Sequence, residues 1–125
     1  MKLYNPNPAG LFTQDCAYRG LSFFLGITWI KAVFELVSFA TSRGRVNFTY
    51  ITNITDYLAC KGYDRHRSPR KGMTVGDFGR QVAMPGHCYL IALEKPKHIT
   101  VVNTELELVD TWDCTEKVVK YYWER

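Results

Sequence analysis

Closely spaced pairs of metal-binding residues are missing from this chain of 125 residues. Its four cysteines and three histidines form no C-x-x-C or H-x-x-x-H pair, and structural zinc sites depend on such spacing. The glycines at 72, 76 and 79 do not follow a predicted strand, as those of a phosphate-binding loop would. We therefore expect no metal, no cofactor and no nucleotide site.

An uninterrupted hydrophobic run of membrane length is also missing. The most apolar stretch, Leu21 to Ala40, is broken by Gly26, Lys31 and Glu35, and a spanning helix would hold the two charges at bilayer depth. The first eight residues lack the apolar segment of a secretory signal. We expect no membrane span and a cytoplasmic protein with reduced cysteines.

Excess positive charge is confined to one segment. The net charge is +4, and the stretch from Lys61 to Lys71 alone holds five cations and one acid. The rest of the chain is close to neutral, and the segment has a single aromatic residue, Tyr63, so nucleic acid is a disfavoured partner. The glycines and proline of segment 61–72 predict a solvated loop. The alternative is a contact with an acidic partner, a protein surface or a phosphate backbone, through Arg65, Arg67, Arg70 and Lys71.

The apolar pattern has a helical period first and the character of strands later. Helices are predicted at 16–25, 29–43, 56–60 and 75–82, with Asp15, Thr28, Asn53 or Thr55, and Thr74 as their caps. The second helix is expected to bury Ile30, Val33, Phe34 and Val37. Strands are predicted at 88–93, 99–102, 106–109 and 118–123. The expected fold is one α+β domain over 1–125, with an irregular lead at 1–13 and N-terminal helices packed on a C-terminal antiparallel sheet.

Cys16 is the candidate nucleophile. At the first turn of a helix it meets the positive end of the macrodipole and unpaired backbone N–H groups, which favour the reactive thiolate. The alternative, a small apolar residue in a core, is expected for Cys60 and Cys88 and left open for Cys114.

His98 is the candidate base, because it opens a predicted strand and so sits on a rigid element. His66 lies among cations that oppose imidazolium formation, and His87 precedes a strand where it can face solvent. A hairpin with the loop Asn103–Glu105 would set His98 opposite Asp110, within reach of a hydrogen bond. A two-residue loop would instead turn Asp110 to the other face.

Two motifs carry a resemblance to a known family. The chain reads Asp15-Cys16-Ala-Tyr-Arg19-Gly20 near its start and His98-Ile-Thr-Val-Val followed by Asp110-Thr-Trp-Asp113 near its end. Over about 14–123 this resembles small phage- and bacteria-encoded papain-like cysteine peptidases, with their D-C-x-x-R-A helix start and D-T-W-D motif. The resemblance implies a papain-like fold, with Cys16 as nucleophile, His98 as base and Asp110 as the orienting acid.

The chain departs from that pattern at several positions. Gly20 replaces the familiar Ala, and Pro96-Lys97 stands where many members have Gly before the His. Asp113 and Asn103 are rivals of Asp110 for the orienting role. Gln14 is a candidate oxyanion donor at an unusually close spacing, with the Cys16 backbone N–H as the other candidate.

The resemblance implies a hydrolase that cleaves a peptide, isopeptide or related amide bond in a protein or peptide substrate, in the host cytoplasm if the chain is phage-encoded. The alternative is a catalytically silent binding protein on the same scaffold, which engages an acidic host protein through the basic loop 61–72. A third interpretation, peptidoglycan amide hydrolysis, requires export or a lysis partner.

Overall fold

Four helices and six strands make up the computed structural model, which describes residues 1–125. The helices are α1 (Cys16–Leu25), α2 (Trp29–Ser42), α3 (Ile51–Cys60) and α4 (Val75–Gln81). The strands are β1 (Lys2–Leu3), β2 (His66–Arg67), β3 (Tyr89–Leu93), β4 (Ile99–Val102), β5 (Leu108–Asp110) and β6 (Val119–Glu124). The predicted order of helices first and the main strands after them is confirmed, and the chain has an α+β architecture.

All six strands belong to one sheet, in the order β1-β5-β4-β3-β6-β2. The four strands predicted from the sequence form its centre and pair antiparallel. Two strands were not predicted. β1 lies in the supposedly irregular lead and pairs parallel with β5, which makes the sheet mixed. β2 lies in the supposed loop 61–72 and pairs with β6. Each has only two residues, too few to show an alternating pattern.

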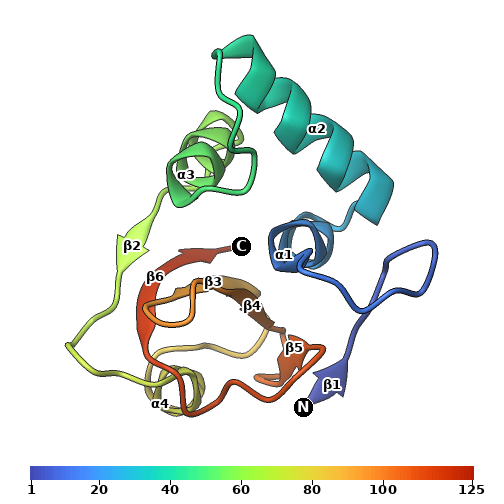
Figure 1. Ribbon diagram of the computed structural model, residues 1–125. Helices are drawn as coiled ribbons and strands as arrows, with labels where there is room; N and C mark the ends of the chain where they lie inside the picture. The colour runs from blue at the N-terminus through green and yellow to red at the C-terminus, as the bar shows by residue number, and fades with distance from the viewer.

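The sheet separates two hydrophobic cores (Figure 1). One core lies between α1 and the face formed by Leu90, Ala92, Ile99 and Val101, with α2 and α3 beyond α1. The other lies between the opposite face and α4, whose Phe78 packs edge-on against Tyr89 and Tyr122. Because strand residues alternate between the two faces, the fully buried run of β3 feeds both cores.

α1 lies unusually close to the sheet. A Cβ atom at Gly20 would stand 2.7 Å from Ile99 Cγ2 and 2.8 Å from Leu90 Cδ1, closer than real Cβ contacts. Glycine at this position therefore lets the helix approach β3 and β4. The helix ends, as predicted, where Gly26 adopts the left-handed conformation at φ 66°.

The remaining helices differ from prediction in detail. The cap of α2 by Thr28 and the capping box of α4, made by Thr74 and Asp77, are confirmed. α3 begins at Ile51, earlier than the predicted Asn53 or Thr55 cap. The predicted buried stripe of α2 is wrong: Ile30 and Phe34 are 62% and 72% exposed, and the buried residues are Ala32, Leu36 and Ala40. α2 carries apolar residues around most of its circumference, so periodicity alone could not select the face.

No helix taken singly has both the length and the apolar character needed to cross a membrane. α1 and α2 together would meet that test, but the chain bends by 108° between them.

Candidate active site

Cys16 is the first residue of α1, as predicted, and is half-buried. Burial raises the pKa of its thiol, but interactions with the His98 side chain and the Ile99 backbone N–H, together with the positive charges of His98 and Arg19, lower it below the ordinary value. The residue before it, Asp15, occupies the N-cap position but makes no capping hydrogen bond. The first backbone N–H groups of α1 therefore remain free to receive an anion beside the thiol.

His98 and Asp110 form a close hydrogen-bonded pair. His98 Nε2 donates to Asp110 Oδ2 at 2.6 Å, with the imidazole 10% and the carboxylate 2% exposed. Burial lowers the pKa of His98, but Asp110 and Cys16 together raise it to about 9. Because Nε2 is engaged by Asp110, Nδ1 is the ring nitrogen left for Cys16. The structure thus brings together the three residues of the predicted trio.

The hairpin register that predicted this pair is wrong by two residues. Val102 pairs with Leu108 and Val101 with Val109, so the loop is Asn103–Glu107 and not Asn103–Glu105. Continuing the register places Thr100, not His98, opposite Asp110. A shift by two keeps every side chain on its face, so His98 becomes the diagonal neighbour of Asp110, and a long side chain still reaches it.

Arg19 is the site residue that the sequence analysis quoted but gave no role. Its guanidinium is 7% exposed and forms ion pairs with Asp15 through Nη1 and with Asp110 Oδ1 through Nη2, the latter at 3.2 Å. Asp15, in turn, accepts a hydrogen bond of 2.8 Å from Trp29 Nε1. Arg19 therefore ties the helix that bears Cys16 to the strand that bears Asp110. The one-turn spacing of Asp15 and Arg19 was the available signal.

The residues after Asp110 complete its surroundings. The Thr111 backbone N–H donates to Asp110 Oδ1 at 2.6 Å, and the Trp112 ring lies 4.9 Å from the imidazole of His98. Asp113 is exposed and accepts hydrogen bonds from Thr115, and Asn103 accepts from the backbone N–H groups of Glu105 and Glu107. Both rivals of Asp110 are thus engaged elsewhere.

Cys114 lies behind Asp110. It is buried, its Sγ donates to Asp110 Oδ2 at 3.8 Å, and burial raises its pKa to about 12, so the thiol is neutral. His98, Asp110 and Cys114 place ligand-type atoms within 4.8 Å of one another. A cation held by these atoms would have to break the hydrogen bond between His98 Nε2 and Asp110 Oδ2.

The other thiols and histidines lie away from this cluster. Cys88 is buried, as predicted, and burial raises its pKa to about 11. The prediction of a core thiol at Cys60 is wrong, because this last residue of α3 is exposed. His66 stacks on Tyr122, and His87 Nδ1 is 3.0 Å from Glu124. Gln14 is exposed and makes no hydrogen bond with the protein.

The four basic residues proposed to bind a partner do not form one surface. Arg70 hydrogen-bonds Gln81 and pairs with Asp77 at 3.4 Å, beside α4, and the exposed Lys71 follows it. Arg65 instead lies over the Tyr121 ring, 4.0 Å from its centroid, and Arg67 pairs with Tyr121 across β2 and β6. Arg65 and Arg67 therefore lie with Tyr121 on the α1 side of the sheet, whereas Arg70 lies on the α4 side.

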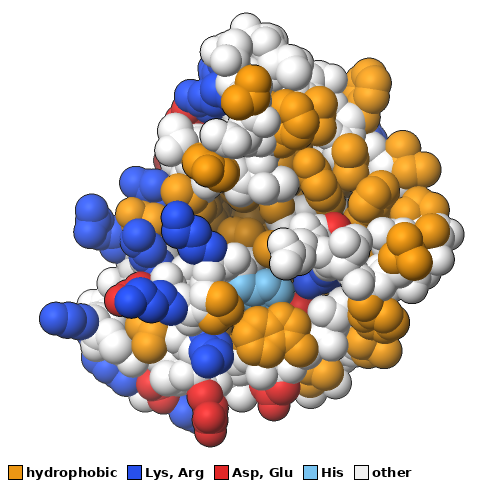
Figure 2. Space-filling view, in the orientation of Figure 1, with side chains coloured by type: hydrophobic (Ala, Val, Ile, Leu, Met, Phe, Trp, Pro, Cys, Tyr) orange, Lys and Arg blue, Asp and Glu red, His pale blue; other side chains and the backbone are white.

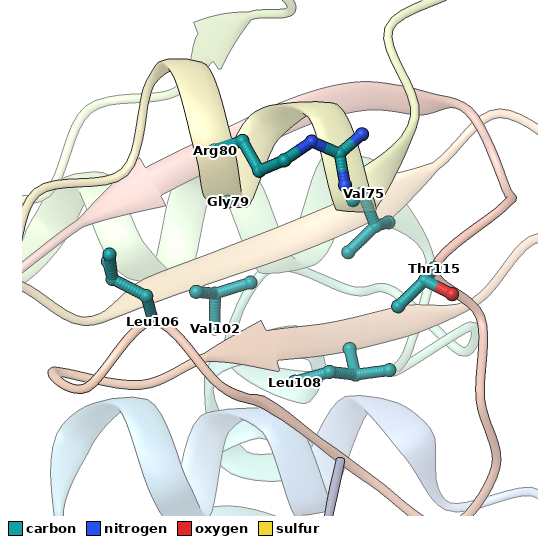
Figure 3. A pocket seen from close by; sticks show the side chains of 8 residues that line it. Val75, Gly79, Arg80, Val102, Leu106, Leu108 and Thr115 are labelled. Carbon is teal, nitrogen blue, oxygen red and sulfur yellow. The ribbon is translucent and has the colours of Figure 1, made fainter.

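A pocket lies on the other side of the sheet. It has a volume of about 420 Å³ and lies between α4 and the β4–β5 hairpin, with Val75, Gly79 and Arg80 on one side and Val102 and Leu108 on the other (Figure 3). None of the candidate catalytic residues lines it.

Comparison of the chain with protein-family models, with curated proteins and with solved structures finds no match. The functional argument therefore rests on the geometry of the site.

Proposed function

We propose that this protein is a papain-like cysteine hydrolase that cleaves a peptide, isopeptide or related amide bond. The observation that carries the proposal is the buried chain of polar contacts from Cys16 through His98 to Asp110, with Nε2 and Oδ2 2.6 Å apart. The lowered thiol pKa and the raised imidazole pKa together favour a thiolate–imidazolium pair, the reactive form of a cysteine nucleophile.

The proposed reaction has two stages. The Cys16 thiolate attacks the carbonyl carbon to form a C–S bond, and the developing oxyanion lies against the free N–H groups at the start of α1. The C–N bond then breaks as His98 passes its proton to the leaving amine, which leaves an acyl-enzyme. Water next attacks that thioester while His98 takes its proton, the C–S bond breaks, and the acid product leaves with Cys16 and His98 restored.

Asp110 and its neighbours support His98 in this scheme. The carboxylate fixes the tautomer with the proton on Nε2 and stabilises the imidazolium, while Trp112 limits the access of water to the pair. Arg19 and the Thr111 N–H hold the carboxylate in place and act as positioning groups.

Brief alkylation with iodoacetamide near pH 6 tests the proposal, with peptide mass mapping as readout. Cys16 should be modified well before Cys88 and Cys114, whose raised pKa values and burial keep them as thiols. A Cys60→Ser background removes the exposed thiol from the comparison. Modification of Cys16 only after unfolding would mean that it is an ordinary core thiol.

The alternative function is a silent papain-like binding protein that uses the basic segment. It predicts that Cys16→Ala keeps full cellular activity while charge reversal at Arg65 and Arg67 abolishes it. The hydrolase predicts that Cys16→Ala loses all hydrolysis with little change in melting temperature, because a half-buried thiol contributes little packing.

A further inference from the structure

Three cations around Tyr121 have no acidic partner. Arg65, Arg67 and Lys120 form no ion pair, whereas Arg70 and Arg80 share Asp77, Arg45 pairs with Asp56 and Lys61 pairs with Glu35. Figure 2 shows lysine and arginine side chains gathered on one side of a hollow whose floor is hydrophobic. Cations left unneutralised in one place attract an acidic ligand.

Tyr121 organises these three cations. The Arg65 guanidinium carbon lies 4.0 Å and Lys120 Nζ 5.4 Å from the centre of its ring, so both cations interact with the ring face. Arg67 is directly opposite Tyr121 in the β2–β6 pairing, and directly opposed side chains share a face of the sheet. We refer to Arg65, Arg67, Lys120 and Tyr121 as the cationic subsite.

Arg67 and Tyr121 of the cationic subsite are on the same face of the sheet as α1, and Lys120 reaches the Tyr121 ring from the adjacent strand position. Tyr121 packs against the core that contains Ala17 of α1, whereas the neighbouring Tyr122 belongs to the core on the α4 side. Along one row of the sheet, Ala92 is paired with both Ile99 and Tyr121. The Ile99 backbone N–H interacts with the Cys16 thiol, so this row leads from the nucleophile to Tyr121.

The length of that row sets the position of the bound group. Two strand spacings separate Ile99 from Tyr121, which corresponds to about 10 Å, and an extended peptide advances about 3.3 Å per residue. The straight-line spacing from Cys16 to the subsite therefore corresponds to about three residues of extended peptide. Ala92 and Ile99 are themselves buried, so the peptide does not lie on them.

We propose that the cationic subsite selects substrates with a carboxylate side chain about three residues from the scissile bond. The inference rests on the proposed function, because the distance is counted from Cys16. An acidic peptide is favoured over a nucleic acid because Arg65 and Lys120 occupy the face of Tyr121, the aromatic ring on which a base would have to stack.

Peptide-linked electrophiles test this selection on the intact chain in a Cys60→Ser background. Two series of short peptides carry a thiol-reactive group, one at the N-terminus and one at the C-terminus, and each varies only the third residue among Glu, Gln and Lys. In one series the Glu peptide should label Cys16 about tenfold faster than the Lys peptide, and about 1 M salt should remove most of this ratio.

Charge variants identify the residues responsible. Arg65→Gln with Arg67→Gln should abolish the preference, and Arg65→Glu with Arg67→Glu should reverse it. Lys71→Glu is the matched control, because it changes the charge of the same segment but follows Arg70, which is bound beside α4. A melting curve confirms that each variant is folded.

Equal labelling rates for the Glu and Lys peptides in both series, or an equal effect of Lys71→Glu, would overturn the inference. The inference would also be overturned if an oligonucleotide protected Cys16 from labelling at a lower concentration than the Glu peptide does. A clear Glu preference with no hydrolysis of the corresponding amides would leave the inference standing and defeat the proposed function. Hydrolysis without a Glu preference would support the proposed function and overturn the inference. If Cys16 reacted with none of the peptides, the inference and the proposed function would both be overturned.

Discussion

Among single residues, Asp110 carries the most interactions in the site, since it holds His98, Arg19 and Thr111 at once. Asp110→Asn should lower kcat/KM by about a hundredfold, because an amide neither enforces the tautomer nor stabilises the imidazolium. It should also destabilise the fold by about 3 kcal/mol, since the buried Arg19 loses one of its two anions.

Asp113→Asn is the matched control for this prediction. Asp113 is exposed and contacts only Thr115, so kcat/KM should be unchanged and the stability should shift by at most about 0.5 kcal/mol. Steady-state kinetics and thermal melts decide the matter. A damaging Asp113→Asn beside a silent Asp110→Asn would show that Asp113, and not Asp110, orients His98.

The proton on His98 predicts a pH profile. Its pKa is raised to about 9, so the imidazolium persists through neutral pH and is lost as the pH rises through about 9. On the acid side, activity should fall only as the pH drops through the lowered pKa of Cys16, where the thiolate is protonated. We expect a plateau of kcat/KM around neutral pH, bounded by these two limbs.

Asp110→Asn again provides the control for the pH profile. The hydrogen bond and the negative charge of Asp110 are causes of the raised pKa, so their loss should move the alkaline limb to lower pH. An alkaline limb that stays in place in this variant would show that Asp110 does not set the protonation of His98.

Among the contacts between whole elements, the packing of α1 against the sheet most directly sets the position of Cys16. Gly20→Ala would place a methyl group 2.7 Å from Ile99 Cγ2, so the helix or the strand must shift. Overpacking costs about 1–3 kcal/mol, partly offset by the gain of about 1 kcal/mol in helix propensity. We therefore expect a net loss of stability of at most about 2 kcal/mol and a clear loss of kcat/KM, because Cys16 moves relative to His98.

Gly79→Ala in α4 is the comparison for Gly20→Ala. A Cβ atom at Gly79 would meet nothing within 4 Å, so kcat/KM should stay at the level of the unaltered protein. Equal activity of both variants would show that the close approach of α1 is not needed for the site.

The elements also show what the sequence could and could not predict. Side chains alternate between the two faces of a strand, and the apolar pattern shows which face is buried. The sequence therefore predicts correctly that His98 and Asp110 share a face, even though the hairpin loop is two residues longer than expected. The loop length itself depends on Asn103, which accepts two backbone hydrogen bonds, and on Leu106, which adopts a positive φ of 63°. Such a conformation is uncommon for leucine, so local turn preferences did not predict it.

Long-range pairing accounts for the features that local patterns missed. The ion pair of Arg19 with Asp110 joins residues far apart in the sequence, and the spacing of Asp15 and Arg19 revealed only half of it. The strands β1 and β2 exist because a neighbouring strand offers hydrogen bonds, not because their own residues alternate.

At the scale of the whole molecule, the N-terminal segment closes the edge of the sheet beside the acid of the site. Lys2 and Leu3 pair with Val109 and Asp110, the Tyr4 N–H donates to the Asp110 carbonyl oxygen at 3.1 Å, and the Tyr4 hydroxyl is 3.0 Å from Ser22 Oγ on α1. The first four residues thus contact both β5 and the helix that carries Cys16.

Removal of residues 1–4 should therefore loosen β5 without unfolding the centre of the sheet. Hydrogen exchange at the Asp110 amide, which faces β1, should become faster, while the β3 amides, which lie between two strands, should keep their protection. The melting temperature should fall by about 4 °C for each kcal/mol lost. Because Asp110 holds His98, kcat/KM should fall with the protection of β5.

Tyr4→Phe is the comparison for the truncation. It keeps the ring packed on Phe23 and loses only the hydroxyl contact with Ser22, so it should show the smaller effect. Unchanged exchange at the Asp110 amide after the truncation would mean that β1 adds nothing to the support of Asp110.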